Sequence, residues 1–265
     1  MAERIDVGRI ELAYERRGEG PAVVFVHGLG GRKESWEAVL AAVVSAGYEA
    51  IAIDMGGAGD SDRPAGPYSV EGWAADLIGL LEGLSIPRAA LVGHSVGCMV
   101  VEHAALALED RCPALAMLGG AVAWGPGFDA ALNERAELAR SGRMREVADA
   151  VATTGFSEEA RTERPELIER FVELFVANDP EGYAESALAT ARGRMLEPDA
   201  IRCPALAFAG SEDPVTPPDA SKEIAAAMPR GEFTTVADGA HWCQMELPEA
   251  VGDLLAEFLG RSGIG

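Results

Sequence analysis

The sequence is poor in positive charge, and lysine in particular is scarce. It contains 22 lysine and arginine residues against 43 aspartate and glutamate residues, a formal net charge of −21. Lys33 and Lys222 are the only lysines. A chain this acidic is repelled by phosphate backbones and by anionic lipid surfaces. We therefore expect a small-molecule substrate as its partner, with no nucleic acid and no membrane; the composition leaves the oligomeric state open.

Cysteine is also scarce, and long apolar runs are absent. The four cysteines lack the spacing of metal ligands, and in a reducing compartment they are expected as free thiols. No segment approaches the roughly 20 uninterrupted apolar residues that a membrane-spanning helix needs, and the first residues lack the apolar core of a signal peptide. We therefore expect a cytoplasmic protein that uses no metal and no other cofactor.

The rest of the composition is typical of a globular α/β protein. Hydrophobic residues make up 48% of the 265 positions, which is enough for a large core in one folding unit. Strand-like and helix-like patterns alternate, which predicts a mostly parallel, doubly wound sheet. After a hairpin near residues 5–14, the expected strands are 23–27, 49–53, 89–93, 114–119, 205–209 and 232–236, and the expected helices are 35–46, 71–84, 96–108, 217–228 and 248–259.

The pattern changes between residues 121 and 199, where no strand-like run occurs and charged segments have helical spacing. One helix is expected behind Pro165, and a second is expected to begin after Asp179 with Pro180 in its first turn. We therefore predict two domains. Residues 1–120 and 200–265 form the core domain, and residues 121–199 form a helical cap inserted after the sixth strand.

The most informative motif is Gly-His-Ser-Val-Gly at residues 93–97, which stands between an apolar strand and a helical run. The turn at such a junction is so tight that side chains at Gly93 and Gly97 would collide, and it exposes the serine. A serine hydroxyl is a weak nucleophile unless a base takes its proton during attack. Ser95 is therefore the predicted nucleophile; an ordinary serine in a strand–helix turn is the alternative.

The base is sought among four histidines. His27 and His94 lie inside turn motifs, where they would orient loops, and His103 is expected on a helix. Only His241 occupies a loop after a late strand. An imidazole suits the work because its ordinary pKa near 6.5 lets it accept a proton and return it to a leaving group. His241 is therefore the predicted base, with a surface-loop histidine as the alternative.

A carboxylate must hold such a histidine in the correct tautomer. Asp213 follows the strand expected at residues 205–209, and Glu212 is its only close rival. An Asp-Pro step also begins many turns, which is the competing interpretation. Ligands in open α/β sheets bind at the carboxyl edge of the strands, so Asp213, Ser95 and His241 can converge there.

The chain order Ser95, Asp213, His241, with the glycine-rich loop at residues 27–31, resembles the α/β-hydrolase fold family over about residues 9–259. The resemblance implies that these three residues are nucleophile, acid and base. Within the family the sequence is similar to capped serine hydrolases of the enol-lactonase, esterase and carbon–carbon bond hydrolase branch. The implied reaction is cleavage of an ester, lactone or related acyl bond through an acyl-enzyme. Ser95 excludes the aspartate nucleophile of dehalogenases and epoxide hydrolases.

The glycine-rich loop at residues 27–31 can bring a backbone N–H close to a reacting carbonyl. A tetrahedral intermediate carries an oxyanion, and the backbone amides of Leu29 and Val96 are the expected donors to it.

A cap over the carboxyl edge would cover the serine and shape the substrate pocket. The candidate pocket residues are Trp124, Phe128, Met144, Phe156 and Met195, with packing against the main domain as the competing role. Arg192 and Arg194, near the end of the cap, are candidates for binding a substrate carboxylate, and solvated arginines are the alternative.

A second glycine-rich loop, at residues 54–61, superficially suggests a phosphate cradle. It lacks the lysine and the helix start of a P-loop, so we interpret it as a turn with positive φ angles. Gly56 stands where relatives often carry arginine or proline, which predicts a loosely held loop. One functional alternative stays open: a hydrolase-like receptor that binds a small molecule, turns it over slowly or not at all, and signals through a protein partner.

Overall fold

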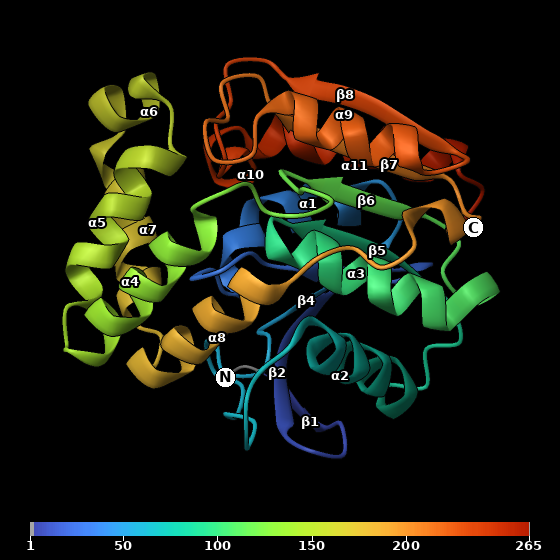
Figure 1. Ribbon diagram of the computed structural model, residues 1–265. Coiled ribbons are helices and arrows are strands. Elements are labelled where there is room, and N and C mark those ends of the chain that lie inside the picture. Colours follow the sequence, from blue (N-terminus) through green and yellow to red (C-terminus); the bar gives the residue numbers. More distant parts are fainter. Residues whose placement is uncertain (1–2, 265) are drawn as a thin grey trace.

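The computed structural model describes residues 3–264, whose strands form one eight-stranded sheet in the order β1-β2-β4-β3-β5-β6-β7-β8 (Figure 1). The hairpin β1–β2 and the pair β2–β4 are antiparallel, and all other neighbours are parallel. This sheet confirms the predicted α/β-hydrolase fold. The strands are β1 (Glu3–Asp6), β2 (Glu11–Arg17), β3 (Ala22–Val26), β4 (Glu49–Ile53), β5 (Ala89–His94), β6 (Leu115–Leu118), β7 (Ala205–Gly210) and β8 (Gly231–Val236).

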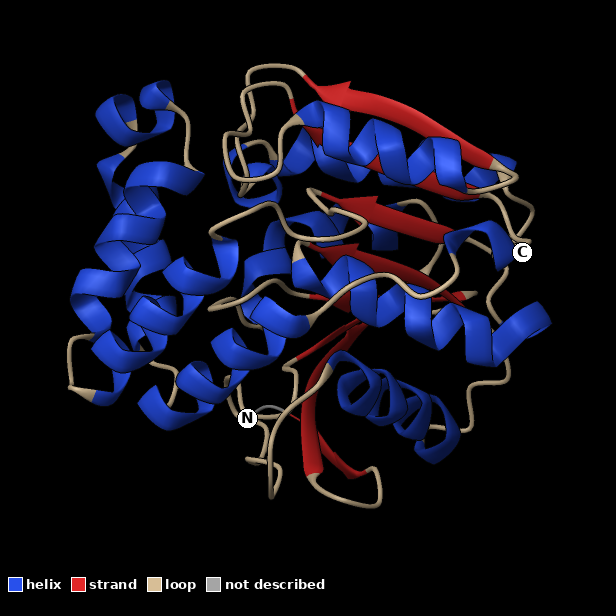
Figure 2. Ribbon diagram, viewed as in Figure 1, coloured by secondary structure: helices blue, strands red, loops and turns tan. Residues whose placement is uncertain are grey.

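Helices cover both faces of the sheet (Figure 2). Alternate residues of β3 point to opposite faces: Val24 packs with one apolar cluster and Phe25 with the other. The first cluster includes residues of α2 (Val70–Gly83), α3 (Val96–Leu108) and α9 (Pro218–Ala227), and the second includes residues of α1 (Glu37–Ser45) and α11 (Pro248–Arg261). Within residues 3–264, no helix combines the length and the apolar character needed to cross a membrane.

The observed boundaries stay close to the predicted ones. The strand at 49–53 and the helix at 96–108 coincide with β4 and α3. The helix expected at 35–46 is instead a 3-10 turn, Lys33–Trp36, followed by α1. The short helix α10 (Cys243–Glu246), which directly follows His241, was not expected because four residues carry no periodic pattern.

Five α-helices separate β6 from β7, and they lie together beyond the carboxyl ends of the strands (Figure 1). They are α4 (Phe128–Arg140), α5 (Met144–Gly155), α6 (Glu158–Glu163), α7 (Pro165–Val176) and α8 (Pro180–Arg192). As expected, Pro165 and Pro180 begin helices, and the Asp179 side chain caps α8 by accepting a hydrogen bond from Gly182 N. The helices share an apolar cluster of their own. The assignment of residues 121–199 as a separate cap domain stays a prediction; we use the name helical insertion for α4–α8.

The helical insertion is anchored to the glycine-rich loop that follows β3. The amide nitrogen of Asn178 donates to Gly30 O at 3.1 Å, and its amide oxygen accepts from Gly59 N at 2.8 Å. Gly30 has φ 79°, and a Cβ built on it would lie 2.1 Å from the ring of Phe175 on α7. A larger residue at this position would therefore push the helical insertion away from the loop.

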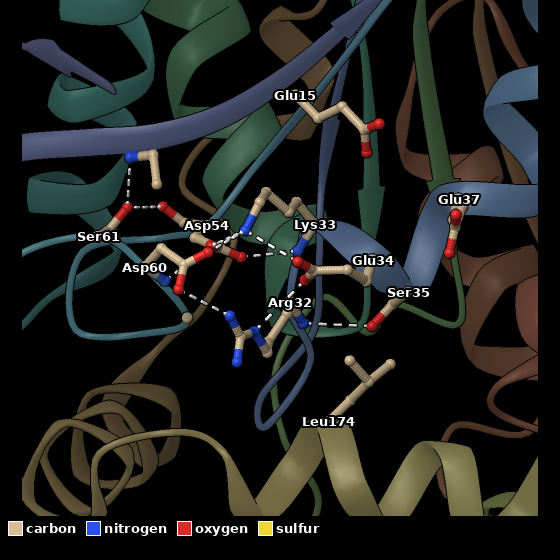
Figure 3. A network of polar contacts seen from close by, with 12 residues as sticks. Glu15, Arg32, Lys33, Glu34, Ser35, Glu37, Asp54, Asp60, Ser61 and Leu174 are labelled. Carbon is tan, nitrogen blue, oxygen red and sulfur yellow. Dashed lines mark hydrogen bonds and ion pairs between the residues drawn. The ribbon is translucent and has the colours of Figure 1, made fainter. Parts of the chain in front are cut away.

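The loop at residues 54–61 contains the expected positive φ angles, 91° at Gly57 and 55° at Gly59. It is firmly held, contrary to the expectation of a loose loop (Figure 3). The side chain of Asp54, completely buried, accepts hydrogen bonds from Lys33 N at 2.7 Å, Lys33 Nζ at 2.8 Å and Asp60 N at 2.9 Å. Gly56 alone therefore does not decide how firmly the loop is held, because the restraint comes from a lysine on a distant segment.

Lys33 carries its charge in a buried position. Its ammonium group also donates to Asp60 Oδ2 at 2.7 Å. Burial opposes the charge, but Asp54 and Asp60 outweigh this effect and raise the pKa of Lys33 above its ordinary value. One ionic cluster therefore joins the 54–61 loop to the 3-10 turn before α1.

Candidate active site

Ser95 forms the junction between β5 and α3 in a backbone conformation that few residues adopt. Its φ is 55° and its ψ is −121°. A Cβ on Gly93 would lie 2.4 Å from Gly97 O, and a Cβ on Gly97 would lie 2.6 Å from Val26 O, so both positions require glycine as expected. A strained conformation of this kind costs about 1–3 kcal/mol and persists where the surroundings enforce it. Here the surroundings hold the serine at the end of the strand.

His241 and Asp213 form a buried hydrogen-bonded pair. His241 Nδ1 lies 2.8 Å from Asp213 Oδ2, while the other carboxylate oxygen accepts from the backbone N–H groups of Val215 and Thr216. Burial alone would raise the pKa of Asp213, but the adjacent His241 and the hydrogen bonds from Thr216 bring it below its ordinary value. An ionised Asp213 therefore orients the ring with Nδ1 protonated and leaves Nε2 available as an acceptor.

Glu212, the rival carboxylate, is exposed, and its side chain makes no hydrogen bond to His241 among the described residues. Only its backbone is engaged, as its N–H donates to Gly239 O. The geometry therefore pairs His241 with Asp213.

Thr216 belongs to this cluster and was not identified from the sequence. Its Oγ1 lies 2.8 Å from Gly119 O, 2.9 Å from Asp213 Oδ2 and 3.1 Å from His241 Nδ1. The side chain thus fixes the carboxylate, the imidazole and the loop after β6 relative to one another. The sequence contains a cue to this role, because a threonine three residues after an aspartate can form local hydrogen bonds to it through its side chain and its backbone N–H.

Two further histidines organise the loops around Ser95, as expected. His94 Nε2 lies 2.9 Å from His241 O and donates to it. Burial, and then the nearby His241, hold the pKa of His94 well below its ordinary value, so the ring is neutral. His27 Nε2 accepts from Met55 N at 3.0 Å. Each ring thus connects two loops of the carboxyl edge.

Ser95 and His241 line one cavity of about 40 Å³ beneath the helical insertion. The wall contributed by the core also includes Leu29, and the wall contributed by the insertion includes Phe128 and Arg135. Among the described residues no hydrogen bond joins the Ser95 hydroxyl to His241, although both residues line this cavity. A nucleophile and a base on one cavity wall can act on a single bound carbonyl, and such contacts often tighten only when substrate binds.

The two expected oxyanion donors lie beside Ser95. Leu29 and Val96 share the wall of an adjoining cavity, and Leu29 lines both cavities. Among residues 3–264, neither backbone N–H donates to a protein acceptor. The backbone also comes close, because a Cβ on Gly28 would lie 2.9 Å from the Ser95 Cβ. Two unpaired N–H groups this near the serine can donate hydrogen bonds to an oxyanion.

Of the five candidate pocket residues, the structure places only Phe128 in the wall of the Ser95 cavity. Trp124 stacks on Phe128, with ring centroids 4.6 Å apart. Met144 and Phe156 are buried in the apolar cluster of the helical insertion, and Met195 is buried against the core. These last three side chains therefore take the competing role of packing: Met144 lies on α5, Phe156 directly follows α5, and Met195 lies in the segment after α8.

The two candidate arginines lie elsewhere. Arg192 and Arg194 line a separate cleft with Glu71. The arginine that lines the Ser95 cavity is Arg135 of α4, which the sequence interpretation did not single out. The sequence contains a cue to this position, because Arg135 follows Leu132 by three residues and residues three apart share one helix face. Both residues line the cavity.

Comparisons with known proteins agree with this arrangement. A family profile described as alpha/beta hydrolase fold matches residues 21–248. The 3-oxoadipate enol-lactonase 2 of Acinetobacter baylyi is 30% identical over 244 residues, which cover 89% of this chain and 81% of that protein. The chain therefore belongs to the α/β-hydrolase fold family, and it is a hydrolase.

Solved structures support the same assignment. The enol-lactonase from Burkholderia xenovorans LB400 superposes with a TM-score of 0.92 at 28% identity, covering 97% of this chain and 100% of that one. A thermophilic esterase from Thermogutta terrifontis, solved with malate bound, also gives a TM-score of 0.92 at 28% identity, covering 98% of this chain and 99% of that one.

Proposed function

We propose that this hydrolase cleaves an ester or lactone bond of a small molecule, with Ser95 as nucleophile, His241 as general base and Asp213 as the group that orients the histidine. The observation that carries the proposal is the 2.8 Å contact between His241 Nδ1 and Asp213 Oδ2, with His241 and Ser95 in the wall of one cavity. The names of the relatives, enol-lactonase and esterase, support the same class of bond.

The reaction begins when Ser95 Oγ attacks the substrate carbonyl carbon while His241 Nε2 takes the hydroxyl proton. The carbonyl oxygen becomes an oxyanion and accepts hydrogen bonds from the N–H groups of Leu29 and Val96. The carbon–oxygen bond to the leaving group then breaks. His241 donates its proton to the departing oxygen, which leaves an acyl-enzyme on Ser95.

Water completes the cycle. It attacks the acyl carbonyl as His241 Nε2 takes one of its protons, and a second oxyanion forms at the same two N–H groups. Collapse of this intermediate breaks the bond to Ser95 Oγ, which recovers its proton from His241. Asp213 stays ionised throughout and stabilises the transient imidazolium. The products are a carboxylic acid and an alcohol or enol, joined in one molecule when the substrate is a lactone.

The test is a panel of short p-nitrophenyl esters and lactones with the wild type and Ser95→Ala. Turnover is expected to disappear almost completely in Ser95→Ala, since the members of a triad act as a unit. Ser262→Ala is the matched control, because among the described residues its hydroxyl bonds only to Phe258 O at the end of α11. Thermal unfolding verifies that each variant is folded.

An organophosphonate ester provides a second measurement. It is expected to form a covalent adduct on Ser95, located by mass spectrometry of the digested protein. Substantial turnover in folded Ser95→Ala, or an adduct on another residue that accompanies inactivation, would contradict the proposal. The receptor alternative predicts slow, single-turnover release from the wild type, so sustained turnover excludes it. A cytoplasmic location stays a prediction.

A further inference from the structure

Arg135 of α4 is one of several arginines in this acidic chain that no carboxylate neutralises among the described residues. Among the described residues it takes part in no ion pair within 4.0 Å, although the chain has 43 acidic residues. Arg140, on the same helix, contrasts with it and pairs with Glu137, Glu181 and Glu185. The guanidinium of Arg135 therefore remains available to an anionic ligand.

Among the described residues, the position of Arg135 distinguishes it from the other unpaired arginines. Its half-buried side chain lines the cavity that holds Ser95 and His241, and it is the only permanently charged side chain in that wall among the described residues. Most of the remaining wall is apolar or uncharged, and includes Leu132 and Trp242. A guanidinium in such surroundings interacts strongly with any anion that enters, because little water screens it.

Tyr183 of α8 supplies a second unpaired donor beside Arg135. Its ring is buried and its hydroxyl oxygen lies close to the Arg135 guanidinium, which can donate to it, but in the described part of the chain the hydroxyl proton has no acceptor. Burial raises the pKa of Tyr183 above its ordinary value, and the nearby positive charge of Arg135 opposes this shift. Tyr183 lines the adjoining cavity, whose wall shares Leu29 and Thr190 with the Ser95 cavity. A buried hydroxyl proton without an acceptor is costly unless a ligand supplies one.

We infer that Arg135 and Tyr183 bind a free carboxylate of the substrate, so that the natural substrate is an ester or lactone carrying a second, ionised carboxyl group. This inference rests on the proposed function. A guanidinium matches a carboxylate in shape and can donate two parallel hydrogen bonds to it. A single cation balances a carboxylate, whereas a phosphate dianion needs more positive charge than this wall contains.

The experiment compares substrates that differ by one group. Mono-p-nitrophenyl esters of succinate, glutarate and adipate are paired with the butyrate, valerate and hexanoate esters, in which a methyl group replaces the carboxylate. The uncatalysed rate of each ester is subtracted. The wild type is expected to prefer the acidic ester by about tenfold or more in kcat/KM for at least one chain length, since hydrogen bonds to charged groups have this strength.

Arg135→Gln is expected to reduce kcat/KM for the acidic ester by about 10- to 100-fold, mainly through KM, and so to remove the preference. Arg135→Lys should retain part of it, because the charge stays while the planar fork is lost. Tyr183→Phe should also reduce kcat/KM for the acidic ester, but by less than Arg135→Gln does. Arg140→Gln is the matched control on the same helix, and it should retain the full preference because Arg140 is exposed and outside the cavity.

Binding without turnover gives an independent measurement. Glutarate or adipate should raise the melting temperature of Ser95→Ala, and the rise should be smaller in Ser95→Ala/Arg135→Gln. The inference is overturned if the wild type favours the neutral esters at every chain length. It is also overturned if folded Arg135→Gln loses kcat/KM equally for the acidic and the neutral ester. These outcomes leave the proposed function intact if Ser95→Ala is inactive. Full activity of Ser95→Ala would instead refute the proposed function.

Discussion

The side-chain carboxylate of Glu246 accepts a hydrogen bond of 2.6 Å from the backbone N–H of Ser157, which connects the core to the helical insertion. Its second oxygen accepts from Ala240 N at 2.7 Å, directly before His241. Glu246 is only 3% exposed. One buried carboxylate therefore fixes both the loop that presents the imidazole and the start of α6.

Replacing Glu246 by glutamine should destabilise the protein and slow turnover. The amide has only one oxygen, so its NH₂ group would face one of the two backbone N–H groups and leave that donor unsatisfied. Each unsatisfied buried group costs about 1–3 kcal/mol. Chemical denaturation measures the loss, and kcat reports the displacement of His241. Glu249→Gln, at an exposed site on α11, is the control and should change neither quantity; equal effects in both variants would contradict the role of Glu246.

Asp213→Asn should reduce kcat by about 10⁴-fold, the effect of the same change in a comparable triad. The asparagine can present its NH₂ to His241 Nδ1, which selects the tautomer that cannot accept a proton from Ser95. Glu212→Gln is the adjacent control and should keep nearly full activity, because the Glu212 side chain is exposed. If kcat falls severely in Glu212→Gln and only mildly in Asp213→Asn, then Glu212 and not Asp213 is the acid of the triad.

Features of this protein that depend on local sequence could be predicted, whereas those that depend on packing could not. The turn at Ser95 could be predicted because its requirements are local: an apolar strand, glycines at 93 and 97, and a helical run. Asp213 and His241 could be placed because strands β7 and β8 end just before them, at an edge that parallel strands share.

The pocket could not be predicted in the same way. A helical pattern indicates which residues are apolar, but it does not tell whether an apolar face meets the core, another helix or a cavity. Phe156 and Met144 therefore pack inside the helical insertion, while Arg135, a charged residue on the same layer, lines the Ser95 cavity. The Lys33–Asp54 pair was missed for a related reason, since 21 positions separate the partners along the chain.

Lys33→Met should lower the free energy of unfolding by about 3–5 kcal/mol, the cost of removing one partner from a buried ion pair. Asp54 would remain buried with its charge unbalanced, and the 54–61 loop would lose its attachment to the segment before α1. Denaturant titration measures the change. Lys222→Met is a natural control because Lys222 is the only other lysine and is exposed on α9. A similar small change in both variants would show that the cluster contributes little to stability.

The stability of the protein should fall as the pH decreases below about 6.5, the ordinary pKa of histidine. Burial lowers the pKa of His94 and of His27, so below that pH the unfolded chain binds more protons than the folded one. Each group then contributes a loss approaching 1.4 kcal/mol per pH unit, until the pH reaches its folded pKa. Urea titrations between about pH 5 and 8 measure the slope. His94→Asn should reduce it, since only His27 of this pair remains, and an unchanged slope in a folded variant would contradict a neutral, buried His94.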